Sequence, residues 1–155
     1  MLKLYNTFVL PHLNYCNLVW GGAYKTSLNS LYITQKRALK ICLNLPRDTP
    51  SKVVFDKSNV TSIQGIHSIQ TCILMYKYHN NLLPNSYNGK FKSNREFHQY
   101  QTKSASLYHI PKPRTNKFKM SLMYKGPILW NNLSVDIRNS EPLSLLKSKL
   151  KSFFV

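Results

Sequence analysis

The sequence predicts a mainly α-helical protein, a small helical bundle with one long basic and aromatic-rich loop region. Apolar residues recur at the 3.6-residue period of a helix in four separate stretches. Proline, glycine or asparagine residues stand where these patterns stop. Between the third and fourth stretches, cations and aromatic rings alternate without a helical period. We therefore expect a helical region over residues 1–84, a loop region over 85–125, and C-terminal helices over 126–155 that pack on the first region.

The first predicted helix covers residues 2–20 and is apolar around most of its circumference. At about 100° per residue its polar members fall on one narrow stripe, which consists of Lys3, Asn6, Thr7, Asn14 and Asn17. The remaining faces are expected to be covered by protein. Pro11 removes one backbone donor, so we expect a kink or a break there. Gly21 and Gly22 end the segment.

Two further helices are predicted before residue 85. Residues 25–45 form a helix with an apolar seam whose polar member is Gln35, and Pro46 ends it. Residues 46–61 are a polar connection, in which residues 53–55 form a short strand or a helical turn. Residues 62–83 form the third helix, which ends near Asn80, Asn81 and Pro84.

The chain becomes irregular after this and then returns to helix. We expect residues 85–125 to be a long loop with a short β-hairpin near residues 106–120. A helix then begins at Gly126 with Pro127 in its first turn. Ser140 is the predicted N-cap of a last helix over residues 142–154. Phe153, Phe154 and the first helix are expected to expose apolar surface that further domains would cover.

The charge balance points to an anionic partner. The chain has 155 residues, with 22 Lys and Arg against 5 Asp and Glu, and a formal net charge of +17. A compact body with this excess repels itself unless an anion is near, and phosphate backbones are the expected anion. Solubility alone needs a much smaller imbalance. A membrane surface is a weaker reading, because the cations are spread over loops and several helices.

The residues needed for catalysis are sparse. Two-metal nucleotidyl transfer requires clustered carboxylates, whereas the five acids here are scattered. His12 and Cys16 are four residues apart, but no acid near them completes a triad, so packing explains them better. No zinc spacing or glycine-rich phosphate loop is present. We therefore expect no catalytic or metal site and no cofactor. Three dispersed cysteines and the lack of a signal peptide or membrane span indicate a cytoplasmic or nuclear protein that is not secreted.

Two groups of residues are candidates for binding nucleic acid. Lys36 and Lys40 lie one helical turn apart, with Arg37 beside them, so the three can follow a phosphate backbone. The alternative is a solvated helix face. In the second group, rings stack on unpaired bases while cations hold phosphates; the alternative is a disordered loop whose rings dock on the helices. This second group consists of Arg95, Tyr100, Tyr108, Lys112, Arg114, Lys117 and Lys119.

Four strings in this order resemble one family. They are LYNTFVLPHLNYCNLVWG from Leu4, QKRALKI from Gln35, MYKYHNNLLP from Met75, and RTNKFKMSLMYKGPILWNNLSVDIRNS from Arg114. With this spacing, essentially the whole chain resembles the thumb and post-thumb region of LINE-type, jockey-like non-LTR retrotransposon reverse transcriptases. None of these strings is a catalytic motif.

The resemblance implies a thumb-like region that grips a template–primer duplex. The implied partners are RNA, an RNA–DNA hybrid or DNA, together with the palm and fingers of a full-length parent. This chain lacks the palm with its paired aspartates, so we expect no enzymatic activity from it alone. Two alternatives remain, a stand-alone basic RNA-binding module and a truncated transposon relic without a selected function.

Overall fold

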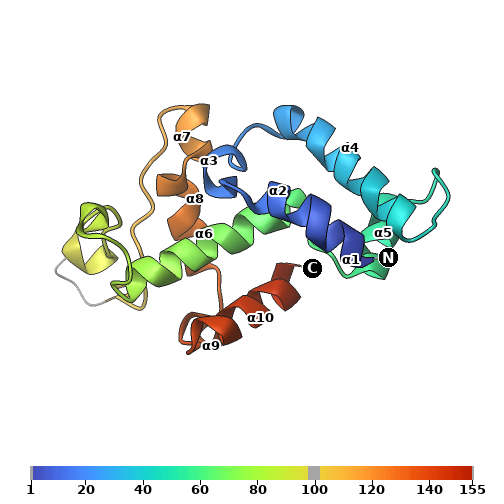
Figure 1. The fold of residues 1–155 in the computed structure, drawn as a ribbon. Coiled ribbons are helices and arrows are strands. Elements are labelled where there is room, and N and C mark those ends of the chain that lie inside the picture. The colour runs from blue at the N-terminus through green and yellow to red at the C-terminus, as the bar shows by residue number, and fades with distance from the viewer. Residues whose placement is uncertain (1, 98–101, 155) are drawn as a thin grey trace. The chain divides into compact units, whose positions relative to one another are not determined.

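The computed structural model describes residues 2–97 and 102–154, and these residues are mainly α-helical, as predicted (Figure 1). The first elements are α1 (Leu2–Leu4), the π-helical turn η1 (Tyr5–Val9), α2 (Leu10–Asn14), α3 (Asn17–Trp20), α4 (Lys25–Cys42), α5 (Ser51–Ser58) and α6 (Ile63–His79). The 3₁₀ turns η2 (Asn85–Tyr87) and η3 (Asn94–Glu96) follow, and then α7 (Asn116–Met120), α8 (Leu122–Asn131), α9 (Val135–Arg138) and α10 (Leu143–Phe154).

The chain forms two compact units. The first unit is Met1–Gln70 together with Lys151–Val155, and the second is Thr71–Leu150. The boundaries therefore fall inside α6 and inside α10. The three-part organisation expected from the sequence, with regions 1–84, 85–125 and 126–155, stays a prediction.

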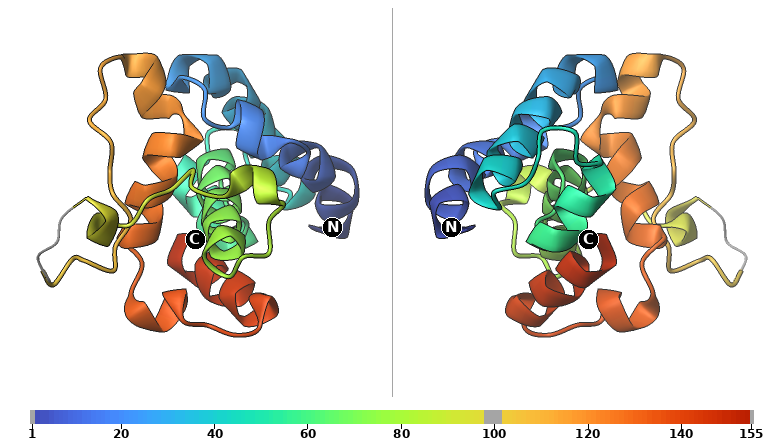
Figure 2. Two further views of the ribbon diagram at one scale, coloured as in Figure 1. Left: turned by 90° about the vertical axis from the view of Figure 1, so that its left-hand side faces the viewer. Right: turned by 90° about the vertical axis from the view of Figure 1, so that its right-hand side faces the viewer.

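The core of the first unit brings the N-terminal segments onto α4, α5 and the start of α6. Tyr5, Leu39 and Val54 are fully buried, and Ile63 and Ile66 join them. Figure 2 shows α4 beside the N-terminal helical segments. Each such side chain contributes about 1.5–3 kcal/mol on full burial, so this cluster commits one face of α4 to the interior and leaves the other face open.

One buried side chain ties these segments together by hydrogen bonds. Gln35 of α4 is 1% exposed. Its Nε2 donates to the Tyr5 hydroxyl at 2.9 Å and to the Thr61 carbonyl at 3.0 Å, while its Oε1 accepts from the Ile63 amide at 3.0 Å. The apolar seam predicted for this helix therefore does include Gln35, and its amide is satisfied by three different segments.

The first predicted helix differs from expectation. Its chain widens into the π-helical turn directly before Pro11, where the Leu10 amide donates to Tyr5 O, so the expected distortion at the proline is confirmed. A second, unpredicted break follows at Cys16, whose φ is 48°. Because this break rotates the following turn, Asn17 is buried instead of exposed.

The expected burial of this segment on most sides is wrong. Leu4, Phe8, Tyr15 and Val19 are 57–84% exposed, whereas a helix covered on most sides would hide them. The exposed apolar surface expected at the first helix is present. Phe153 is also exposed, at 53%, while Phe154 is partly buried.

The core of the second unit joins α6 to α8. Trp130 of α8 is 3% exposed and its ring lies 6.5 Å from that of Tyr76. Gly126 permits this approach, because a Cβ there would lie 3.0 Å from Met75 Sδ, closer than nearly all real contacts. Pro127 lies inside α8, which begins at Leu122, so the prediction that it opens the helix is wrong. Gly126 and Pro127 are both buried, and the proline costs α8 one backbone hydrogen bond.

Two other expectations for this unit are wrong. Among the residues described, the predicted hairpin near 106–120 is absent: Ser93 and Tyr108 form an isolated bridge, and α7 begins at Asn116. The two prolines at 111 and 113 lack the donors that a second strand needs. Ser140 does not cap α10; its buried hydroxyl donates to Asp136 O at 2.8 Å and accepts from Lys149 Nζ at 2.9 Å. Between residues 46 and 61, the helical-turn alternative is confirmed by α5.

Candidate nucleic-acid interface

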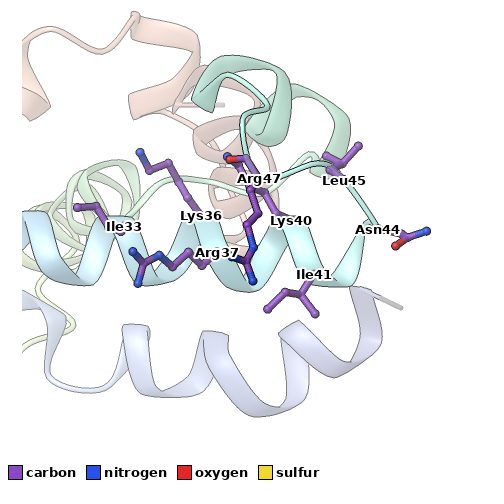
Figure 3. Close-up of a pocket in the computed structure, with 8 residues that line it drawn as sticks. All are labelled: Ile33, Lys36, Arg37, Lys40, Ile41, Asn44, Leu45 and Arg47. Atoms are coloured by element: carbon purple, nitrogen blue, oxygen red, sulfur yellow. The ribbon is translucent and has the colours of Figure 1, made fainter.

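A basic groove lies along α4 in the first unit. It has a volume of about 850 Å³ and is lined by Ile33, Lys36, Arg37, Lys40, Ile41, Asn44, Leu45 and Arg47. Four of these eight residues are cations and none is acidic. Figure 3 shows that the cationic side chains project from α4 and from the turn that follows it. The three cations predicted on this helix are therefore brought together in one concave surface.

Neighbouring groups hold the two lysines in place. Lys36 Nζ donates to Ser51 Oγ at 3.1 Å and lies 4.7 Å from the centroid of the Tyr32 ring. Tyr32 in turn stacks on Phe55 of α5, with ring centroids 5.7 Å apart. Lys40 Nζ donates to the Arg47 carbonyl at 2.5 Å. Each ammonium has three donors, so each retains two for an external anion.

The two arginines extend the charge across the groove. Arg37 and Arg47 are both exposed, and a guanidinium can bind a phosphate through two parallel hydrogen bonds. Arg47 was missed from the sequence because it follows Pro46, beyond the helical pattern. The turn after α4 brings Arg47 to the groove. In this turn the Leu45 amide donates a hydrogen bond to Lys40 O at 2.9 Å. A search for cations within one turn of the helix end would have found it.

The second group of predicted nucleic-acid-binding residues is not brought together in one concave surface. Lys117 and Lys119 are exposed on α7, whose N-cap Thr115 accepts from the Phe118 amide at 3.2 Å. Arg95 is exposed on η3, and Lys112 and Arg114 are exposed on the irregular segment before α7. None of these five cations lines the α4 groove. Tyr100 lies outside the described residues.

Tyr108 is engaged within the second unit. Its ring packs edge-on against Tyr78 at 5.9 Å, and its hydroxyl lies 3.1 Å from His79 Nδ1. Asn131 of α8 holds its backbone, accepting from the Tyr108 amide at 3.1 Å and donating to its carbonyl at 2.8 Å. Burial, with smaller contributions from Tyr78 and Glu96, raises the pKa of Tyr108 to about 12. These contacts hold the Tyr108 ring in a fixed position within the second unit.

Two kinds of feature are absent from the residues described. Within residues 2–97 and 102–154, no three His, Cys, Asp or Glu side chains gather in a way that suits a metal ion. In the same ranges, no helix combines the length and the hydropathy required to cross a membrane. The residues that line the α4 groove supply hydrogen-bond donors, positive charge and apolar contacts.

Comparisons with known proteins add no relative. No protein-family model matches the chain, and the searches of curated proteins and of solved structures found no match either.

Proposed function

We propose that this chain is a non-catalytic nucleic-acid-binding piece of a retrotransposon-type RNA-directed DNA polymerase. In this proposal the α4 groove grips the backbone of an RNA–DNA template–primer duplex. The observation that carries the proposal is the clustering of Lys36, Arg37, Lys40 and Arg47 around one groove that no acid lines. The resemblance of the four strings to the thumb and post-thumb region supports the parent class.

The groove suits a phosphate backbone better than a small ligand. Three of its four cations, Lys36, Arg37 and Lys40, come from successive turns of α4, so they are spaced along the helix axis. Lys36 and Lys40 are anchored by Ser51 and the Arg47 carbonyl, which reduces the entropy lost when they contact an anion. Contacts of this kind fix the position of a duplex and do not read its sequence.

The exposed apolar side chains support a polymerase context. Leu4, Phe8, Tyr15 and Val19 stand out from the first helical segments, each at least 57% exposed. Large exposed apolar side chains that are near one another mark surfaces that other proteins cover. In a full-length polymerase, the palm and fingers would supply that cover.

A titration with RNA–DNA hybrid at several salt concentrations tests the proposal. Changing Lys36, Arg37 and Lys40 together to Gln removes three cations from the groove. We expect weaker binding to all sequences, and a log–log salt slope that falls by about 2–3, since each phosphate contact contributes about 0.7–0.9. Gln retains the helical propensity of these positions, so circular dichroism should be unchanged.

The matched control changes Lys3, Lys147 and Lys151 to Gln. These exposed lysines do not line the groove, and their loss lowers the net charge by the same amount. We expect a much smaller change in both affinity and slope. Equal effects of the two triple variants would show that only total charge matters. An unchanged slope in the groove variant would show that this face of α4 is merely solvated.

A further inference from the structure

The second unit contains a separate hollow with aromatic walls. Its volume is about 460 Å³ and it is open to solvent, which lies in the range of about 300–1,000 Å³ typical of small-ligand sites. Tyr78, His79, Phe91 and Tyr108 form part of its lining, and Glu96 is its acidic residue. The α4 groove of the first unit shares no residue with it.

Hydrogen bonds fix the aromatic walls. The Tyr78 hydroxyl donates to the Phe91 carbonyl at 2.9 Å and accepts from the Phe91 amide at 3.2 Å. The rings of these two residues are 4.9 Å apart and nearly perpendicular. Asn131 holds Tyr108 through both backbone atoms. A planar ligand would therefore meet walls that are already in place, which limits the entropy lost on binding.

The Glu96 carboxylate is oriented by its own turn. Its Oε1 accepts from the Ser93 amide at 2.8 Å and from Ser93 Oγ at 3.1 Å, which completes a capping box on η3. No donor in residues 2–97 or 102–154 is hydrogen-bonded to Oε2. One carboxylate oxygen thus keeps this turn in shape, and the other is left to accept from a ligand.

Several cations lie next to the lining residues of this hollow in the chain. Lys90, Lys92 and Arg95 are exposed and adjoin the lining residues Gly89, Phe91, Ser93 and Glu96 in the chain. The combination of aromatic walls, one carboxylate and outlying cations matches an unpaired nucleotide. Rings hold the base, an acceptor reads its edge, and cations meet the neighbouring phosphates.

We infer that this hollow binds one unpaired base of a single-stranded nucleic acid and prefers guanine, whose N–H edge is read by Glu96. Guanine places two donors, N1–H and the N2 amino group, side by side, so both can donate to the two lone pairs of Glu96 Oε2. Adenine and cytosine place an acceptor beside their amino group, and uracil flanks its N–H with two carbonyls, so each turns a lone pair towards the carboxylate. The inference rests on the proposed function only in taking the ligand to be nucleic acid.

The test uses the whole chain and short uridine-rich RNA strands that differ in one central nucleotide. The strand with guanosine should bind about tenfold more tightly than the strand with adenosine, which is the size of one good base-edge contact. Glu96→Gln should abolish this preference. Because the substitution also removes a negative charge, it should leave binding of the adenosine strand unchanged or slightly tighter.

Two controls separate base reading from folding and from charge. Gln also completes a capping box, so thermal unfolding of Glu96→Gln should match the parent chain. Glu141→Gln makes the same charge change at an exposed residue that does not line the hollow, and it should keep the guanosine preference. The inference is overturned if the parent chain shows no preference, if Glu96→Gln keeps it, or if Glu141→Gln loses it.

The same strands distinguish this inference from the proposed function. The groove variant, in which Lys36, Arg37 and Lys40 are changed to Gln, should not alter the ratio between the two strands. A lost guanosine preference with intact hybrid binding would overturn the base site alone. An intact preference with no effect of the groove variant on hybrid binding would overturn the α4 groove alone.

Discussion

Gln35 illustrates how one polar side chain organises the first unit. It lies on the apolar face of α4, where a leucine would fill similar space. Its amide instead satisfies the Tyr5 hydroxyl, the Thr61 carbonyl and the Ile63 amide. These partners belong to the first helical segment, to the residues before α6, and to the first turn of α6. A buried amide with all three partners in place costs little and specifies how the segments meet.

Replacing Gln35 by Leu should therefore destabilise the protein despite the gain in apolar character. The change leaves three buried or partly buried polar groups without a partner, each at a cost of about 1–3 kcal/mol if it is not rehydrated. We expect a loss of about 2–4 kcal/mol in the free energy of unfolding, measured by urea denaturation.

Two further variants check this interpretation. Asn29→Ala, at an exposed position of the same helix, should change the stability by less than about 0.5 kcal/mol. Tyr5→Phe should cost less than Gln35→Leu, and the two changes should be non-additive because they remove one shared hydrogen bond. Strict additivity, or a Gln35→Leu protein as stable as the parent, would contradict the proposed role.

At the scale of elements, α8 holds the irregular part of the second unit through one residue. Asn131 forms two hydrogen bonds with the backbone of Tyr108, an arrangement that resembles a short piece of sheet ladder. The segment around Tyr108 also bridges to Ser93, and the His109 amide donates to Lys92 O at 2.8 Å. The loops on both sides of the aromatic hollow are therefore anchored to a helix by a side chain.

Asn131→Ala should release this segment without melting the helices. The Tyr108 amide loses its acceptor, so its hydrogen exchange should accelerate by about tenfold, the equivalent of one lost hydrogen bond. Helical content from circular dichroism should change little. The neighbouring Asn132 is exposed, and Asn132→Ala should leave exchange at Tyr108 as it was. Unchanged protection in Asn131→Ala would show that the aromatic contacts alone hold the segment.

At the scale of the whole molecule, the large net charge is the feature that bears on both stability and nucleic-acid affinity. A formal charge of +17 with only five acids places many like charges on a small body, and their repulsion disfavours the compact state. The cations cannot be neutralised internally, because the acids are too few. Stability and nucleic-acid affinity should therefore respond to salt in opposite directions.

Raising the ionic strength from about 0.01 M to about 0.15 M shortens the Debye length from about 30 Å to about 8 Å. We expect the thermal unfolding midpoint of the free protein to rise over this range, because like charges are screened from one another. Affinity for RNA–DNA hybrid should fall over the same range, because salt competes for the phosphates. Differential scanning fluorimetry and anisotropy titrations measure the two effects. A midpoint that falls with salt would show that attractive pairs outweigh repulsion in the folded protein.

The helices themselves were largely predictable, because local forces set them. The apolar period of residues 25–45 and the cation-bearing face opposite it follow from 3.6 residues per turn. The helix that was predicted to reach residue 45 ends at Cys42, a few residues before Pro46. Asn44 after α4 and Asn81 after α6 both have the positive φ typical of a helix end. The groove cations Lys36, Arg37 and Lys40 were found for the same reason.

Tertiary packing decided the rest. The break at Cys16 buries Asn17 and exposes Tyr15 and Val19, although their spacing alone gives the opposite pattern. Pro127 is tolerated inside α8 because Gly126 and Trp130 pack in the core of the second unit. Tyr108 and Glu96 line the same hollow, and the Tyr108 backbone is held by the side chain of Asn131, which is distant in sequence. Local periodicity determines where helices form, but contacts between residues far apart in the chain determine which faces are buried and which side chains meet, because those contacts exist only after the chain has folded.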